Sequence, residues 1–499
     1  MNRSHYSIFA LITAYAGILL IIFGLAFLLK LYLPLLIGLM VGGCYMMYVH
    51  FIHKNENKFS VIMGKKNSGY LVLFCLIFFP VIGTIIIAGC YLHQTINQEI
   101  LCILFAEGIL FGAIPTLFSI PFILKNELFY KSDQKSYSLP PLITIIVPAY
   151  NEELNIKWTI ESVKQTTYPN KQIIIVDDGS NDNTHVEAQK ALQNYPSERC
   201  LVLKKPNGGK ASALDFGLEY AKGEIIVTID SDSIVNRNAF DEMVNLLQNP
   251  DVSAIAGNPR VLNRVNIITN CQQLEYSVGN LFKRLQSILG TVMVIPGVLG
   301  AFKNDKLIER GKYTSDTLAE DFDATIKILK SRKTILLSSD SIVYTQTPSD
   351  LKNLYKQRIR WDRGTLQTFV KHKNILSYSR YGLLSSFSYP ILLLLFVAAP
   401  LFDILLIALV IILSFTSLSW NIIPLLVSGF FAIPVLIALI SLVLDKVDWK
   451  IAIYAPLMIF GYRQLLAAIR IKSIVDVLVI KKNFCWTSVK RTKHLGGTT

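Results

Sequence analysis

Long apolar runs and short mixed runs alternate along this chain of 499 residues. Near the N-terminus, a helix formed from any of four apolar runs would be long enough to cross roughly 30 Å of hydrocarbon at about 1.5 Å per residue. These runs are 8–29, 31–52, 70–92 and 100–124. A cleavable signal is not expected, because the first run is longer than a signal-peptide core and a second run follows almost at once. The pattern predicts four transmembrane helices within residues 1–125.

Between residues 139 and 381 the pattern changes to short β-branched runs separated by amphipathic, charged segments. Such runs predict buried strands, and apolar positions at helical spacing predict helices. The expected strands are 142–147, 172–176, 200–203 and 224–229, and the expected helices are 152–165, 184–192 and 210–221. Repeated alternation of strand and helix is typical of a doubly wound α/β sheet with parallel strands, which binds its ligands at the carboxyl ends of the strands. We therefore predict a soluble α/β domain.

Apolar runs return in residues 383–480. Two of them are long enough to span a membrane, and a third is shorter and interrupted by Arg463. The three runs are 383–415, 422–444 and 451–469. Three spans would place the basic tail 481–499 outside the cell, against the positive-inside rule, whereas two spans and an interfacial third segment would keep it inside. The segment is expected to contribute two or three transmembrane helices.

Composition agrees with a membrane protein that also has a soluble part. Hydrophobic residues make up 52% of the chain, the mean hydropathy is +0.44, and charged residues make up only 17%. An ordinary soluble protein has about 25% charged residues. These values exclude a disordered chain, a coiled coil and a purely cytosolic enzyme. The seven cysteines include no C-x-x-C pair, so neither a zinc site nor a disulfide framework is indicated.

The formal net charge of +14 would suggest nucleic-acid binding in a soluble protein. Its distribution favours a membrane instead, because eight basic residues and a single acidic residue, Asp476, follow residue 451 beside apolar segments. Basic flanks of membrane helices face the cytoplasm and meet anionic headgroups. Basic stretches at 54–66 and 125–135 place the N-terminus and the α/β domain in the cytoplasm by the same rule. We expect an integral protein of the plasma membrane that contacts lipid and no nucleic acid.

Polar motifs follow the first two predicted strands, where the fold would bind a ligand. The first strand leads into Tyr150-Asn151-Glu152 and the second into Asp177-Asp178-Gly179. A carboxylate at a strand end can accept hydrogen bonds from a nucleotide base or ribose, and Tyr150 can stack on the base. Asp178-Gly179-Ser180 taken alone also fits a turn followed by a helix N-cap.

The third and fourth strands are followed by residues suited to a diphosphate and a metal. Asn207-Gly208-Gly209-Lys210 opens a helix, and its glycines, helix N-terminus and lysine fit a diphosphate contact, although a simple tight turn has the same pattern. Asp230-Ser231-Asp232 presents two carboxylates one residue apart. Such oxygen ligands suit Mg²⁺ or Mn²⁺, which would bridge the phosphates of a leaving nucleoside diphosphate.

Two further motifs lie closer to the C-terminal apolar runs. Glu320-Asp321 begins an amphipathic segment, where Asp321 can serve as general base for an acceptor hydroxyl or can serve the helix dipole. In Gln357-Arg358-Ile359-Arg360-Trp361, Arg360 fits a diphosphate and the Trp361 indole fits a sugar ring. A helix lying on the membrane surface also explains this stretch, and both interpretations can hold together.

Together these motifs resemble, in order and spacing, the processive family 2 glycosyltransferases with a GT-A fold. That group includes cellulose, chitin, hyaluronan and poly-N-acetylglucosamine synthases. The resemblance covers roughly residues 139–381 and the flanking apolar runs. It implies an α/β GT-A domain inserted between α-helical transmembrane segments. It also implies metal-dependent, inverting and processive transfer from a UDP-sugar to a growing β-linked polysaccharide, which is passed across the membrane.

The resemblance further implies a role for each motif residue. The donor would be held by Tyr150, Glu152, Asp177, Asp178, Lys210 and Asp230. The metal would be held by Asp230 and Asp232, and catalysis would rest on Asp321 and Glu320. Acceptor and diphosphate would be contacted by Gln357, Arg358, Arg360 and Trp361, together with Pro296 and Gly297.

Two departures from the family pattern leave the sugar open. The base motif reads Ala319-Glu320-Asp321, where cellulose synthases usually have Thr and hyaluronan synthases have a Gly-Asp-Asp type. The region after the last apolar run is too short for a cyclic-dinucleotide-binding domain, which argues against a regulated bacterial cellulose synthase. Two other functions stay open, a non-processive lipid glycosyltransferase resembling ceramide glucosyltransferase and an inactive transporter or scaffold.

Overall fold

The computed structural model describes residues 123, 140–305, 313–414 and 423–480. Within these residues, the chain divides into two compact units. One unit contains 140–276, 286–372 and 472–480, and the other contains 277–285 and 373–471. The four expected N-terminal helices and the basic tail lie outside the described residues.

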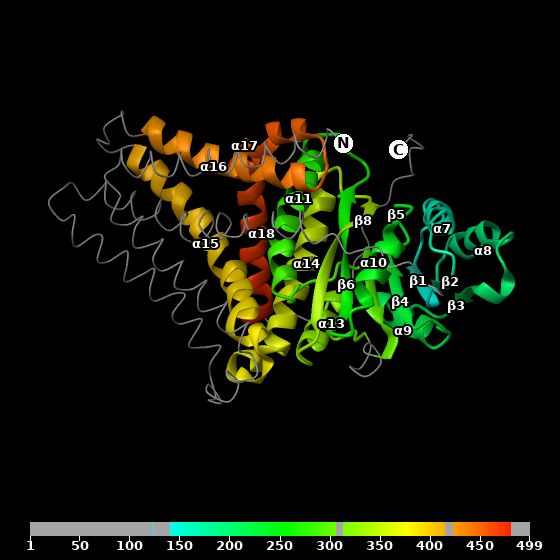
Figure 1. Ribbon diagram of the computed structural model, residues 1–499. Helices are drawn as coiled ribbons and strands as arrows, with labels where there is room; N and C mark the ends of the chain where they lie inside the picture. Colours follow the sequence, from blue (N-terminus) through cyan, green and yellow to red (C-terminus); the bar gives the residue numbers. More distant parts are fainter. Residues whose placement is uncertain (1–122, 124–139, 306–312, 415–422, 481–499) are drawn as a thin grey trace, which may run out of the picture. The chain divides into compact units, whose positions relative to one another are not determined.

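An eight-stranded sheet in the order β3-β2-β1-β4-β7-β6-β8-β5 forms the centre of the first unit (Figure 1). The first four strands pair in parallel, and they are β1 (Ile143–Ala149), β2 (Lys171–Asp177), β3 (Cys200–Lys204) and β4 (Ile225–Ile229). The other four are β5 (Ser233–Val235), β6 (Val252–Val261), β7 (Leu299–Lys303) and β8 (Thr334–Thr345). All four strands expected from the sequence are present.

The expectation of an all-parallel sheet is wrong for the second half. Strand β7 runs antiparallel to both of its neighbours, β4 and β6, and β5 runs antiparallel to β8, whereas β6 and β8 pair in parallel. Strand β7 has the sequence LGAFK, which lacks the β-branched run that marks β1, β2 and β4. The chain reaches it from β6 through the long helix α11 (Ile267–Ile288) and returns in the opposite direction. The sheet is therefore mixed.

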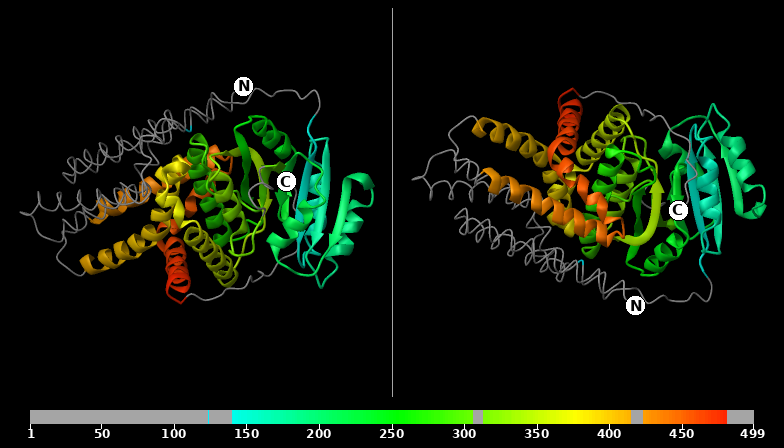
Figure 2. Two further views of the ribbon diagram at one scale, coloured as in Figure 1. Left: turned by 90° about the horizontal axis from the view of Figure 1, so that it is seen from below. Right: turned by 90° about the horizontal axis from the view of Figure 1, so that it is seen from above.

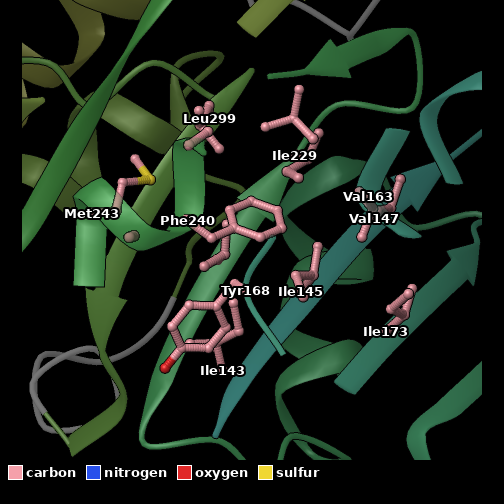
Figure 3. Close-up of a cluster of buried hydrophobic side chains, with 14 of the residues drawn as sticks. Ile143, Ile145, Val147, Val163, Tyr168, Ile173, Ile229, Phe240, Met243 and Leu299 are labelled. Carbon is pink, nitrogen blue, oxygen red and sulfur yellow. The ribbon is translucent and has the colours of Figure 1, made fainter. Parts of the chain in front are cut away.

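Helices lie on both sides of the sheet (Figures 1 and 2). Side chains alternate between the faces of a strand, so Ile143, Ile145 and Val147 of β1 share one face. They join a buried cluster with residues of α7 (Ile156–Lys164), α8 (Thr184–Leu192) and α10 (Ala239–Leu247) (Figure 3).

The opposite face of the sheet packs against α9 (Lys210–Leu218). A Cβ atom added to Gly217 would lie 2.7 Å from the side chain of Ile146, so this helix approaches the sheet more closely than an alanine would allow. Strand β1 is thus buried on both faces. This burial explains its continuous apolar sequence and holds its carboxyl end rigidly at the site described below.

Two more helices complete the first unit, α13 (Glu320–Leu329) and α14 (Leu351–Lys371). Helix α14 begins at an N-cap, Asp350, whose side chain accepts a hydrogen bond from the N–H of Asn353 at 2.9 Å. Its sequence includes the whole Gln357 to Trp361 motif.

The second unit contains the C-terminal apolar helices α15 (Tyr389–Ser414) and α16 (Ile423–Leu444). Among the described residues, one stretch, Leu384–Leu401, is long and apolar enough to cross a membrane by length and composition, and Pro434–Leu444 is a shorter apolar helix. The expected third run is divided among short turns, α17 (Ala455–Leu457) and α18 (Arg463–Val475), which continues beyond the unit boundary.

Candidate active site

The turn after β1 is built around a residue in the left-handed region. Asn151 has φ 55°, a conformation that Asn adopts more readily than most residues. Its N–H donates to Ser180 Oγ at 2.9 Å, and the N–H of Glu152 donates to Thr184 Oγ1 at 2.7 Å. The Glu152 carboxylate is buried and accepts a hydrogen bond from Asn155. Glu152 thus serves the turn itself, while Tyr150 beside it is half-buried.

Asp177 and Asp178 are both buried at the end of β2. Asp177 Oδ1 accepts the N–H of Ser180 at 2.9 Å, which closes the turn that follows the strand. Asp177 Oδ2 is buried without a hydrogen bond among the described residues, with Lys204 Nζ 3.7 Å away.

The Asp178 carboxylate organises the loop that follows β3. It accepts hydrogen bonds from Lys205 Nζ at 2.7 Å, from the N–H of Gly208 at 3.0 Å and from the N–H of Gly209 at 2.7 Å. A Cβ atom on Gly179 would lie 2.7 Å from the Asn207 nitrogen, so only glycine allows the loop to pack this closely. The two motifs proposed for base and diphosphate therefore form one connected structure.

Lys210 brings the ends of β4, α9 and α13 together. Its Nζ lies 2.6 Å from Asp230 Oδ1 and 3.3 Å from Glu320 Oε1. Burial alone would lower the pKa of Lys210, but the charges of Asp230, Glu320 and Asp321 raise it above its usual range. The lysine is therefore a permanent cation that offsets part of the negative charge of three carboxylates.

Asp321 lies in the first turn of α13, next to the Pro296-Gly297 loop. Its Oδ2 accepts the N–H of Gly297 at 3.1 Å, and its Oδ1 accepts the N–H of Phe322 at 2.8 Å. Burial, together with the charge of Glu320, raises the pKa of Asp321 to about 6, although Lys210 pulls the pKa back. A carboxylate with this pKa is a stronger proton acceptor than an exposed aspartate and is still ionised at neutral pH.

Gly297 lies close to the ends of two side chains of the site. A Cβ atom there would overlap Lys210 Nζ and would lie 3.6 Å from Asp321 Oδ2. The flexible lysine would therefore have to shift if residue 297 carried a side chain. Sequence reasoning placed Pro296-Gly297, Lys210 and Asp321 in separate motifs, and the structure brings all of them into one site.

The Q-x-x-R-W motif lies in the middle of α14. Arg358 makes two parallel hydrogen bonds to Glu275 of α11, at 2.8 and 3.0 Å, and its guanidinium lies 4.5 Å from the centre of the Trp361 ring. Arg358 therefore engages an internal carboxylate in this structure. Gln357 is buried, whereas Arg360 and Trp361 are half-buried.

Three residues of the site region have no counterpart among the residues proposed from the sequence. Glu275 holds Arg358, and Tyr276 beside it has a pKa raised to about 12 by burial, an effect to which Asp232 and Asp230 add. Asp323 is wholly buried in α13. A helix of mixed polarity such as α11 offers no signal that would distinguish Glu275 and Tyr276 from solvent-facing residues.

A divalent cation would depend on two protein carboxylates and on its substrate. Within the described residues, no group of three or more His, Cys, Asp or Glu side chains converges as a metal site. Asp232 is buried and Asp230 is partly exposed. Asp230 already forms an ion pair with Lys210. Two hard oxygen ligands at a position that attracts cations fit Mg²⁺ or Mn²⁺ with phosphate oxygens completing the shell.

Comparison with known proteins extends this geometry. Residues 144–311 match the model of Glycosyl transferase family 2. The chain is 31% identical over 269 residues to a poly-beta-1,6-N-acetyl-D-glucosamine synthase of Staphylococcus aureus strain COL, a match covering 52% of this chain and 65% of the relative. A synthase of the same name from Staphylococcus epidermidis is 31% identical over 231 residues, covering 46% and 56%. The chain thus spans less than two thirds of the length of these relatives.

The fold has a counterpart among solved structures. A mannosyltransferase from Pyrobaculum calidifontis, in complex with GDP-Man and Mn²⁺, superposes with a TM-score of 0.54 at 20% identity. The superposition covers 76% of this chain and 100% of that chain. This likeness concerns the fold. Residues 144–311 thus match the model of Glycosyl transferase family 2, and the domain that contains them has a GT-A-like fold with a mixed sheet.

Proposed function

We propose that this protein is a membrane-embedded, inverting and processive glycosyltransferase that polymerises a β-linked polysaccharide from a UDP-sugar and passes the product across the membrane. The observation that carries the proposal is the convergence of Lys210, Asp230, Asp321 and Gly297 at one edge of a family 2 domain. Sugar transfer from a nucleotide requires a positive charge near the diphosphate, a carboxylate that can bind a metal and a carboxylate that can accept a proton. Lys210, Asp230 and Asp321 would supply these, and the backbone at Gly297 lies close to them.

The donor would lie along the carboxyl ends of β1, β2 and β4. The loop donors Lys205, Gly208 and Gly209 hold the Asp178 carboxylate in place, and the N–H of Gly208 contacts both of its oxygens. Asp178 would contact the base of the nucleotide. Asp230 and Asp232 would hold Mg²⁺ or Mn²⁺, which when bound neutralises charge on the leaving diphosphate. Lys210 supplies a further positive charge on the same side.

The transfer itself would use Asp321 as general base. Its carboxylate takes the proton of an acceptor hydroxyl, and that oxygen attacks the anomeric carbon while the bond from this carbon to the UDP oxygen breaks. Attack and departure occur on opposite faces, so an α-linked donor gives a β-linked product without a covalent intermediate. Glu320 keeps the pKa of Asp321 high, and Trp361 offers a surface for the acceptor ring.

The relatives' names favour N-acetylglucosamine as the transferred sugar, and we propose UDP-N-acetylglucosamine as the donor. The apolar helix of the second unit and the basic flanks of the sequence support a plasma-membrane protein with its catalytic domain in the cytoplasm.

The test is UDP release by the purified protein in lipid vesicles with UDP-N-acetylglucosamine, UDP-glucose or UDP-glucuronate, each with Mg²⁺ or Mn²⁺. Radiolabelled product is then resolved by size, with Asp321→Asn as the matched inactive control. We expect long polymer from UDP-N-acetylglucosamine. A single sugar on a lipid would establish the ceramide-glucosyltransferase-like alternative. Equal UDP release by the parent and by Asp321→Asn would refute the catalytic role of Asp321.

A further inference from the structure

A second acidic residue of α13 is buried on the side away from the proposed base. Asp323 is 0% exposed. Its carboxylate has four partners at 2.7 to 2.8 Å, which are Thr314 Oγ1, Lys327 Nζ, Lys371 Nζ and His372 Nε2. Residues two apart on an α-helix point about 200° apart. Asp321 therefore faces Gly297 while Asp323 faces the end of α14.

The protonation of this cluster follows from its contacts. His372 Nδ1 accepts from Lys330 Nζ at 2.8 Å, so the ring proton is on Nε2 and is donated to Asp323. Burial alone would raise the pKa of Asp323, but hydrogen bonds from His372, Lys327 and Lys371 hold it far below its usual range. The aspartate is therefore ionised, and its charge is matched by lysines from both α13 and α14.

Three residues of α14 also contact the segment at the start of α13. A Cβ atom on Gly364 would lie 2.6 Å from the Ala319 nitrogen and 2.7 Å from the Leu318 carbonyl carbon. One turn later, Gln367 Oε1 accepts the N–H of Leu318 at 3.0 Å. The rings of Phe322 and Phe369 then pack edge to face, with centres 5.4 Å apart. We call this row of contacts between α13 and α14 the seam. The Asp323 cluster lies at the end of the seam, beside the end of α14.

We propose that Asp323 is a positioning residue that fixes the first turn of α13, and with it Asp321, to the helix that carries the Q-x-x-R-W motif. The base at residue 321 and the aromatic platform at Trp361 then keep one mutual geometry through each cycle of sugar addition. The role assigned to Asp321 rests on the proposed function, whereas the contacts at Asp323 do not.

The main test compares Asp323→Asn with Asp316→Asn. Both changes remove a carboxylate bound by Lys371, but the Asp316 side chain is 57% exposed and contacts Lys371 from outside at 2.8 Å. Asp323→Asn should lower kcat about 10- to 100-fold, since a misplacement of about 1 Å can cost on the order of 100-fold. The donor KM and the affinity for UDP should change by less than about twofold, because the donor residues lie at the ends of β1, β2 and β4 and at the start of α9. Asp316→Asn should match the parent.

A folded Asp323→Asn protein with the kcat of Asp316→Asn would overturn the proposal, and so would a loss of donor affinity equal to the loss of kcat. Hydrogen exchange of the 319–325 amides gives a readout that needs no turnover. Exchange should be faster in Asp323→Asn and unchanged in Asp316→Asn. If the parent turns over no UDP-sugar, the proposed function fails, and unchanged exchange in Asp323→Asn would separately refute the positioning contact.

A second pair of variants covers the case in which Asp323→Asn does not fold. Gly364→Ala inserts a methyl group into the seam, whereas Gly279→Ala in α11 places the same methyl group where nothing lies within 4 Å. Gly364→Ala should reduce kcat with the donor KM preserved and should speed exchange at 319–325. Gly279→Ala should do neither. Equal behaviour of the two alanine variants would refute a positioning role for the seam.

Discussion

The rate of the proposed sugar transfer should fall in acid, with a midpoint at the pKa of Asp321. With a pKa of about 6, the carboxylate is about 90% ionised at pH 7 and about 10% ionised at pH 5. If Asp321 is the base, kcat/KM should fall about tenfold between these pH values and approach a limiting slope of one below the pKa. An aspartate with the ordinary pKa of about 3.9 would lose less than about a tenth of its activity over the same range.

Neighbouring charges should move that midpoint in opposite directions. The Glu320 charge raises the pKa of Asp321 and the Lys210 charge lowers it. Glu320→Gln should therefore shift the acid limb below pH 6, and Lys210→Met should shift it above pH 6, whatever their effect on the maximum rate. Asp316→Asn should leave the midpoint in place, because the charge of Asp316 is not among those that shift the pKa of Asp321.

The assay is the initial rate of UDP release at low donor concentration, measured between about pH 4.5 and 8, where kcat/KM reports the free enzyme. Incubation at each pH followed by assay at pH 7 separates titration from unfolding. Asp321→Asn should lower the rate by about 10² to 10⁴ and remove the acid limb from the residual activity. A midpoint near pH 4 in the parent, or an unchanged limb in Asp321→Asn, would refute the assignment.

Three further outcomes are expected. Asp232→Ala should weaken Mn²⁺-dependent UDP binding in calorimetry, and an affinity equal to that of the parent would argue against its role as a metal ligand. Trp361→Ala loses stacking worth roughly 0.5 to 1.5 kcal/mol and should shorten the product, and an unchanged size distribution would contradict the platform role. Tags inserted at 54–66 should be accessible only from the cytoplasm, and cleavage of the catalytic domain by protease outside intact cells would reverse that topology.

Strands β1, β2 and β4 were readable from the sequence because they are buried on both faces, which gives them continuous apolar runs rich in β-branched residues. The edge strand β3 is only half-buried and has a shorter apolar run, and all four strands were located to within two residues. The helix expected from residue 152 begins only at Ile156, because Glu152 and Asn155 form a hydrogen-bonded turn first. Strand β7 was not predicted, because its central residues are Gly300 and Ala301, which do not favour a strand.

The position of candidate residues in the fold could be predicted where they follow a buried strand, as Asp178 and Asp230 do. The partner of a side chain could not be predicted where that partner lies far away in the sequence. Arg358 and Glu275 are 83 residues apart, and His372 and Asp323 are 49 residues apart. Such pairings are set by how α11, α13 and α14 pack together, so no local pattern distinguishes Arg358 from Arg360 within the same motif.

The reversed strand β7 brings the two sides of the candidate site together from different halves of the sheet. Because β7 runs against β4, pairing Ile229 with Leu299, the segment that ends at Val298 arrives beside Asp230 from the opposite half of the sheet. That segment is itself anchored, since Thr291 bridges to Ile335 of β8 and Ile295 is buried. Gly297 therefore reaches Asp321 on a backbone held by β8, so a change in the packing of β8 should alter the acceptor side of the site before it alters the donor side.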